Sequence, residues 1–442
     1  MTDALFPRSF RKSIPTAVRG DGCYLITSDG RRILDAAGSA AVVSIGHGRH
    51  EVTDAIAAQG RSLAFAHTSQ FQTEIAERLA QRLRSLAPPS FRDAGRVFFT
   101  SGGSEATETA LKLARFYHLE RGEPQRVRIL ARRQSYHGST LGAMAVSGNV
   151  ARRAPYLPLL QDWGHIAPCY CYRCPFEKTF PQCNLACAHD LETELQRVDP
   201  KTVAAFIFEP LSGATLGAAE PPDGYVQTIA DICRRHGILL IADEVMTGMG
   251  RTGANFAVYH WSVSPDMILV GKGIASGYAP LGGVIAAPHV ADAIATGSGA
   301  FPHGFTYQAH PLAMAASHAV LDILEREKLF ARVNSAGAAL RRALDPIAKS
   351  PIVGDIRGRG LLFGLEFVRD GKSRAPFPAS AGIAERVRRI CYDQNVAVYP
   401  IQGCVDGKDG DHVLLAPPFT LGDAEISQIA AALQAAVAQI SS

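Results

Sequence analysis

Two charged residues, Asp243 and Lys272, each follow a short apolar run that gives no local reason for a charge. The runs, residues 238–242 and 267–270, have the length and composition of strands buried on both faces of a parallel sheet. In open sheets of this kind ligands bind beyond the carboxyl ends of the strands, so both side chains would reach one crevice. An amine and a carboxylate there suit pyridoxal phosphate (PLP), because the amine can form a Schiff base with the PLP aldehyde and the carboxylate can keep the ring nitrogen protonated.

A glycine turn, SGGSEA at residues 101–106, follows an apolar strand and precedes a helix predicted over TETALKLARFYH. Glu105 lies near the start of this helix, where the helix dipole favours an acidic side chain. The backbone N–H groups of Gly102, Gly103 and Ser104 would point out of the helix N-terminus. They would form an anion site suited to a phosphate.

Two ring-bearing residues, Tyr136 and His137, follow another strand in the run RVRILARRQSYHGST. Tyr136 either packs at the rim of the core or lies flat on a cofactor ring, since aromatic faces favour offset stacking. His137 is either an acid or base in the reaction or a structural hydrogen-bonding residue. Thr306, which precedes a long helix, would by itself be interpreted as a cap or turn residue.

The strand TVAAFIFEP ends in Glu209, and the next strand along the chain ends in Asp243. Between them PPDGYVQTIADICRRHG fits the crossover helix of a right-handed β-α-β unit, which predicts parallel strands and an α/β fold. Val245, two residues beyond Asp243, would point to the same side and could pack under a cofactor ring. Residues 20–35 predict a β-hairpin, and the chain after the long helix predicts a second, smaller α+β domain that ends in an amphipathic helix.

The 442 residues carry 45 basic and 41 acidic side chains, a formal net charge of +4. This balance and the absence of a long basic run argue against a nucleic-acid partner. No apolar stretch approaches the roughly 20 residues that span a bilayer, so no membrane partner is expected. The N-terminal segment lacks the apolar core of a signal peptide, and we expect a cytoplasmic location.

Five of the nine cysteines lie in one short segment: Cys169, Cys171, Cys174, Cys183 and Cys187. Their spacing matches no ligand pattern that we can assign, although thiolates this close together could bind zinc. The alternative is a loop of reduced, packed cysteines, and a cytoplasmic location argues against stable disulfides. We therefore include no metal in the predicted site.

Taken together, these motifs resemble the class III PLP-dependent aminotransferases, the family of ornithine, 4-aminobutyrate and amine:pyruvate aminotransferases. The resemblance runs from the hairpin at 20–35 to the segment APPFTL, and its most specific part is IADEVMTGMGRTG followed by a GKG lysine motif. It implies PLP fold type I, with a mostly parallel seven-stranded sheet in a large domain at residues 56–325. The small α+β domain would come from both chain ends, 1–55 and 326–442. A homodimer or dimer of dimers with the active site at the interface is implied as well.

The resemblance also implies roles for single residues. Lys272 would form the Schiff base and move a proton between the substrate Cα and the cofactor, while Asp243 would hold the protonated ring nitrogen. Val245 and Tyr136 would pack on opposite ring faces, and Thr306 would reach the phosphate from the neighbouring subunit. The residues expected to bind the cofactor are Gly102, Gly103, Ser104, Tyr136, His137, Glu209, Asp243, Val245, Lys272 and Thr306.

The expected activity is transfer of an amino group from an amine or amino-acid donor to a 2-oxo acid by a ping-pong mechanism. Ala214 stands near the place where glutamate-using relatives carry a gating glutamate, and the loop 403–419 has no arginine to grip a carboxylate. Lys408 lacks the bidentate fork of a guanidinium, so pyruvate is favoured over 2-oxoglutarate. Small residues at Ala40 and Ala41 either pack closely or line the pocket. The alternative activities are those of a PLP-dependent racemase, aminomutase or decarboxylase.

Overall fold

The computed structural model describes residues 4–11 and 13–441, and a seven-stranded sheet lies at its centre. Only β10 runs antiparallel to its neighbours, which confirms the mostly parallel sheet expected from the sequence. In spatial order the strands are β4 (Arg96–Thr100), β10 (Gly282–Ala286), β9 (Met267–Val270), β8 (Leu239–Asp243), β7 (Val203–Phe208), β5 (Arg128–Arg132) and β6 (His165–Ile166).

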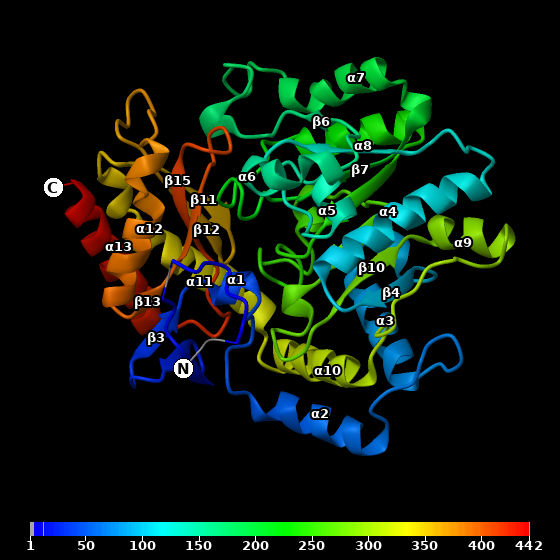
Figure 1. The fold of residues 1–442 in the computed structure, drawn as a ribbon, viewed down its shortest axis with the longest axis horizontal. Helices are drawn as coiled ribbons and strands as arrows, with labels where there is room; N and C mark the ends of the chain where they lie inside the picture. Colours follow the sequence, from blue (N-terminus) through cyan, green and yellow to red (C-terminus); the bar gives the residue numbers. More distant parts are fainter. Residues whose placement is uncertain (1–3, 12, 442) are drawn as a thin grey trace.

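Helices cover both faces of this sheet, which explains why its strands are apolar throughout (Figure 1). On one face Ile241 and Leu269 pack with α4 (Gly103–Glu120) and α9 (Pro288–Thr296). On the other face the alternate residues, such as Leu240 and Ile268, pack with α7 (Ala186–Val198) and α8 (Tyr225–His236). Burial on two sides fixes the strands whose carboxyl ends carry the polar residues.

The two chain ends form one region, here called the small domain, which lies to one side of the central sheet (Figure 1). Its first sheet contains the predicted hairpin, and Val396 of the C-terminal part pairs in parallel with Leu34 of the N-terminal part. The strands of this sheet are β1 (Ala17–Asp21), β2 (Tyr24–Thr27), β3 (Arg32–Asp35) and β13 (Val396–Ala397). The domain limits at residues 55 and 325 stay predictions.

A second sheet of the small domain is antiparallel and faces the large domain. Its order is β11 (Val353–Arg359), β12 (Leu362–Phe367), β15 (Asp411–Leu415) and β14 (Tyr399–Gln402). Three helices pack in the same region: α11 (Leu329–Leu344), α12 (Ile383–Asp393) and α13 (Asp423–Ser441). The predicted apolar face of α13 is confirmed, since Ile426, Ile429, Leu433 and Val437 are buried.

The remaining helices connect these regions or flank the pocket. They are α1 (Gly38–Ala41), α2 (His50–Ser62), α3 (Glu74–Leu86), α5 (Leu141–Val146), α6 (Val150–Arg153) and α10 (Pro311–Arg326). Within the described ranges, no helix combines the length and apolar character needed to cross a bilayer.

Candidate active site

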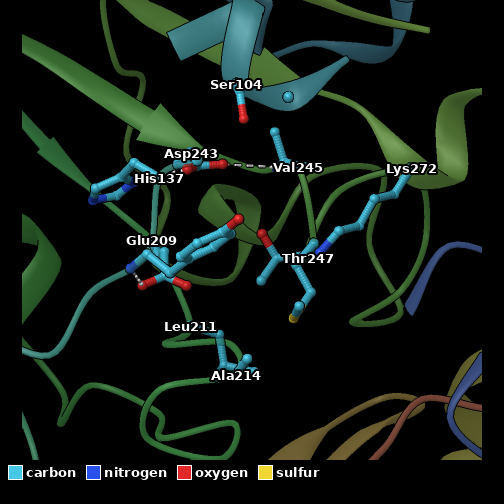
Figure 2. Close-up of a pocket in the computed structure, with 13 residues that line it drawn as sticks. Ser104, His137, Glu209, Leu211, Ala214, Asp243, Val245, Thr247 and Lys272 are labelled. Carbon is cyan, nitrogen blue, oxygen red and sulfur yellow. Dashed lines mark hydrogen bonds and ion pairs between the residues drawn. The ribbon is translucent and has the colours of Figure 1, made fainter. Parts of the chain in front are cut away.

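A pocket opens at the carboxyl ends of β7 and β8, where the sequence places its polar residues (Figure 2). It brings together every predicted site residue except Gly102 and Thr306. The described residues that line it are Gly103, Ser104, Tyr136, His137, Gly138, Glu209, Leu211, Ala214, Asp243, Val245, Met246, Thr247 and Lys272.

The Asp243 carboxylate is buried, and both of its oxygens accept hydrogen bonds. Oδ2 accepts from Nδ1 of His137 at 2.7 Å, and Oδ1 accepts from the backbone N–H of Val245 at 3.1 Å. His137 therefore makes the hydrogen bond that the structural interpretation predicts. A carboxylate held this firmly is suited to keep the ring nitrogen of a pyridine cofactor protonated.

Lys272 follows β9 and enters the pocket from the side opposite His137, toward Thr247 (Figure 2). Its backbone has a φ of 44°, in the left-handed region, which costs a residue with a Cβ about 1–2 kcal/mol. Burial lowers the pKa of the Lys272 ammonium to about 8, although the nearby carboxylates of Asp243 and Glu209 act in the opposite direction. Because only the neutral amine is a nucleophile, this shift prepares Lys272 to attack an aldehyde near neutral pH.

The N-terminus of α4 lies at the pocket. The helix begins at Gly103, four residues before the start that the sequence indicated, because Ser104 and Glu105 already form its first turn. A Cβ on Gly103 would lie 2.9 Å from Cγ1 of Val245, so only glycine allows this close approach. Backbone N–H groups in the first turn of an 18-residue helix have no partners within the helix, and they offer an anion site for a phosphate.

Tyr136 and Glu209 are linked through the backbone. The N–H of Tyr136 donates to Oε2 of Glu209 at 3.2 Å, and the N–H of Gly213 donates to Oε1 at 2.9 Å. Burial raises the pKa of the Glu209 carboxyl group. Glu209 therefore holds the backbone of Tyr136 and Gly213 at the pocket wall. Stacking of Tyr136 and Val245 on opposite faces of a ring stays a prediction.

Several residues singled out in the sequence lie elsewhere. Thr306 is exposed and does not line the pocket of its own chain, and Lys408 is exposed as well. Ala41 is buried against Leu211 and Leu414, and neither Ala40 nor Ala41 lines the pocket, which supports the close-packing interpretation.

Sequence reasoning identified Ala214 as a pocket residue but missed four others: Gly138, Leu211, Met246 and Thr247. Met246 and Thr247 lie just beyond the strand that ends in Asp243, and Leu211 lies two residues beyond Glu209. Their positions just beyond the carboxyl ends of strands could have identified them as pocket residues, because ligands bind there in open α/β sheets.

The cysteine-rich segment contains no set of metal-ligating side chains in the part of the chain that the structure describes. No group of three or more His, Cys, Asp or Glu side chains there could hold a metal ion. All nine cysteines are free, and Cys169, Cys183 and Cys187 are buried. Sγ of Cys169 lies 3.0 Å from Nη1 of the buried Arg132. Cys169 therefore packs beside a buried guanidinium, as the packing interpretation predicts.

These residues fit PLP on three separate counts. The α4 N-terminus can hold a phosphate, Asp243 can hold a protonated ring nitrogen, and Lys272 supplies an amine with a lowered pKa. Gly103 leaves the space beside Val245 that a side chain would fill. The three groups line one pocket, as a ligand with a phosphate at one end of an aromatic ring requires.

Comparison with known proteins gives a consistent result. The model of class-III aminotransferases matches residues 7–437. An uncharacterized aminotransferase of Schizosaccharomyces pombe is 40% identical, over 97% of this chain and 94% of that protein. The crystal structure of a PLP-bound amine transaminase from an uncultivated Pseudomonas species is 37% identical, covers 99% of this chain and 98% of its own, and has a TM-score of 0.92. An (S)-enantioselective omega-transaminase from Thermomicrobium roseum is 36% identical, with coverages of 99% and 96% and a TM-score of 0.92.

Proposed function

Because the chain belongs to the class III aminotransferases and is a PLP-dependent enzyme, we propose that it transfers an amino group from an amine or amino-acid donor to a 2-oxo acid. PLP, when bound, accepts the amino group and withdraws electrons from the substrate Cα. Lys272 Nζ moves a proton at that carbon, since its amine enters the pocket and its lowered pKa of about 8 lets it both accept and release a proton near physiological pH. Asp243 holds the proton on the ring nitrogen, and the α4 N-terminus binds the phosphate.

The choice of pyruvate as acceptor rests mainly on one observation, the chemistry of the pocket wall. Leu211, Ala214 and Met246 line it, and its described lining includes no arginine. A second carboxylate, such as that of 2-oxoglutarate, would be desolvated there without a bidentate partner. The same apolar wall favours amines with apolar substituents as donors. The amine transaminases among the structural relatives are consistent with this proposal.

The decisive experiment supplies purified holoenzyme with an aryl-alkyl amine and either pyruvate or 2-oxoglutarate, and follows ketone formation. We expect ketone with pyruvate, little with 2-oxoglutarate, and parallel double-reciprocal lines, as a ping-pong mechanism requires. With an amino-acid donor and no acceptor, racemisation, isomerisation or release of CO2 would instead indicate a racemase, aminomutase or decarboxylase. Equal rates with both acceptors would overturn the preference for pyruvate.

The same proposal includes a homodimer, or a dimer of dimers, with the site at the interface. Thr306 lies outside the pocket of its own chain, and it is exposed beside Tyr307. Exposed apolar side chains occur on the same surface, where the rings of Phe65 and Tyr307 lie 5.9 Å apart. Sedimentation velocity would test the assembly. A cytoplasmic location is also proposed, and cell fractionation would test it.

A further inference from the structure

One wall of the pocket is an irregular loop rather than a helix or strand. This pocket loop, residues 211–219, closes on itself through a bridge in which the N–H of Ser212 donates to the oxygen of Ala219 at 3.0 Å. Leu211 and Ala214 are its contributions to the pocket lining. Such a loop has few internal bonds, so its position depends on what holds it from outside.

We propose that His412 and Arg357 of the small domain are positioning residues that set the apolar wall of the substrate pocket by holding carbonyl oxygens of the pocket loop. They touch neither the cofactor site nor the reacting atoms, and they act through Ala214. The inference rests on the proposed function, because it assigns the residues that determine how donors fit.

His412 holds the oxygen of Ala214. Its Nε2 lies 2.8 Å from that oxygen, and the imidazole is fully buried. Burial lowers the pKa of His412 to about 4, so the ring is neutral at physiological pH. Because a carbonyl only accepts, Nε2 carries the proton and donates it, and Nδ1 is left as a buried nitrogen without a hydrogen-bond partner.

Arg357 holds the carbonyl oxygen of Leu216, two residues beyond Ala214 in the pocket loop. Its Nε and Nη2 donate to the oxygen of Leu216 at 3.0 and 2.6 Å. The same guanidinium lies 2.9 Å from Oε2 of Glu366 and 3.0 Å from Oδ2 of Asp355. The planar guanidinium of Arg357 is thus ion-paired with carboxylates of the sheet and hydrogen-bonded to a carbonyl of the pocket loop. These contacts fix the loop against the sheet.

Glu366 keeps this arrangement in place from the neighbouring strand. It is fully buried, and it lies directly opposite His412 in the register of β12 and β15. The cysteine-rich segment closes the far side, since Tyr170 donates to Glu366 and Nε of Arg173 donates to it at 2.6 Å. Burial alone would raise the pKa of Glu366, but Arg357 and Arg173 lower it below its usual value, so the carboxylate stays charged.

The packing of the pocket loop on the sheet also requires two glycines. A Cβ on Gly364 would lie 2.0 Å from the oxygen of Gly217, and a Cβ on Gly217 would lie 2.6 Å from Cδ2 of His412. Gly217 also has a positive φ of 59°. The backbone of the loop therefore lies directly on the face of β12 and β15 that carries Glu366 and His412.

Hydrogen exchange of the holoenzyme tests the positioning without any substrate. His412→Phe keeps the ring and removes the donor to Ala214. We expect the amides of Ser212 and Ala218, both bonded within the pocket loop, to exchange roughly tenfold faster, as the loss of one buried hydrogen bond implies. His118→Phe is the matched control, because His118 is equally buried and its Nε2 lies 2.9 Å from the oxygen of Ala204, away from the pocket.

Kinetics with the amine and pyruvate test the consequence. We expect KM for an aryl-alkyl amine to rise about tenfold in His412→Phe while kcat stays within about twofold, since fit changes and the reacting groups do not. His412→Gln, which restores an N–H donor at a similar reach, should recover part of the lost affinity. Arg357→Lys keeps the charge beside Glu366 but loses the planar fork, so KM for the amine should rise in this variant as it does in His412→Phe. Arg357→Lys therefore provides a second test if His412→Phe folds poorly.

Two results would overturn the inference: unchanged exchange in the pocket loop, or equal effects of His412→Phe and His118→Phe on KM. Wild-type enzyme that forms no ketone from any amine would contradict the proposed function instead. The exchange data would still show whether His412 and Arg357 hold the loop, so the two failures are distinguishable.

Discussion

Nδ1 of His137 lies 2.7 Å from Oδ2 of Asp243, although the two residues follow different strands of the central sheet. The backbone N–H of Val245 bonds the other oxygen of the carboxylate. Asp243 is therefore fixed in position before any ligand binds, and its negative charge can stabilise a positive charge on the ligand without further rearrangement.

Replacement of this carboxylate tests its role. Asp243→Asn keeps the shape of the side chain but removes the charge that holds a proton on the ring nitrogen. We expect kcat of the amine half-reaction to fall roughly 10²–10³-fold, the loss typical of one preorganised electrostatic partner. Stopped-flow measurement of the absorbance change on adding amine gives this rate. Asp231→Asn on the exposed surface of α8 should change it little, and a similar loss in both variants would remove Asp243 from the mechanism.

The assignment of Lys272 predicts a spectroscopic change. Lys272→Ala protein mixed with PLP should lack the visible band of a covalently attached cofactor, and borohydride should fix no PLP to the chain, because the only proposed nucleophile is gone. Lys201→Ala, which alters an exposed lysine, should keep both properties. Full turnover by the Lys272→Ala variant would show that the site lies elsewhere.

The lowered pKa of Lys272 predicts how cofactor uptake depends on pH. The reactive form is the neutral amine, so the rate at which apoprotein attaches PLP should rise with pH and level off above a pKa of about 8. An unperturbed lysine would instead give a rate that rises toward its ordinary pKa of 10.5. Rapid-mixing spectroscopy between pH 6 and pH 10 distinguishes the two curves, with roughly tenfold rate change per pH unit below the pKa.

A mixed dimer tests the position of Thr306. Thr306→Val should weaken PLP affinity by roughly tenfold to a hundredfold through loss of one hydrogen bond to a charged group. If Thr306 acts across the interface, hybrids of Lys272→Ala and Thr306→Val subunits contain one intact site and one site with both changes. Titration of PLP into tagged, purified hybrids should then show half of the sites with wild-type affinity. If no site regains that affinity, Thr306 acts within its own chain, and unchanged PLP affinity of the Thr306→Val homodimer would show that it does not act on the cofactor at all.

The fold and the centre of the site could be predicted from the sequence because their signals are local. Apolar runs that end in Asp243 and Lys272 show where the strands stop, and the strand-glycine-helix order marks the α4 N-terminus. The exact start of α4 at Gly103 was missed because glycine and serine are poor helix formers, while the real helix starts where the chain leaves the sheet.

The outer wall of the pocket could not be predicted, because its determinants are far apart in the chain. Strand β11 alternates polar and non-polar residues, but its polar side carries Arg357, which bonds the large domain at Leu216. Nothing local relates Ala214 to His412, which lies 198 positions away. Only the folded chain brings those partners together, and the same is true of Tyr170 and Glu366.

The pairing of Leu34 with Val396 sets an order of events during synthesis. Strand β3 leaves the ribosome early, but its partner β13 emerges only after more than three hundred further residues. The large domain can acquire its sheet while translation continues, since domains commonly fold as units from the N-terminal side. Strand β15, which carries His412, emerges later still, so the pocket loop gains its last anchor near the end of translation.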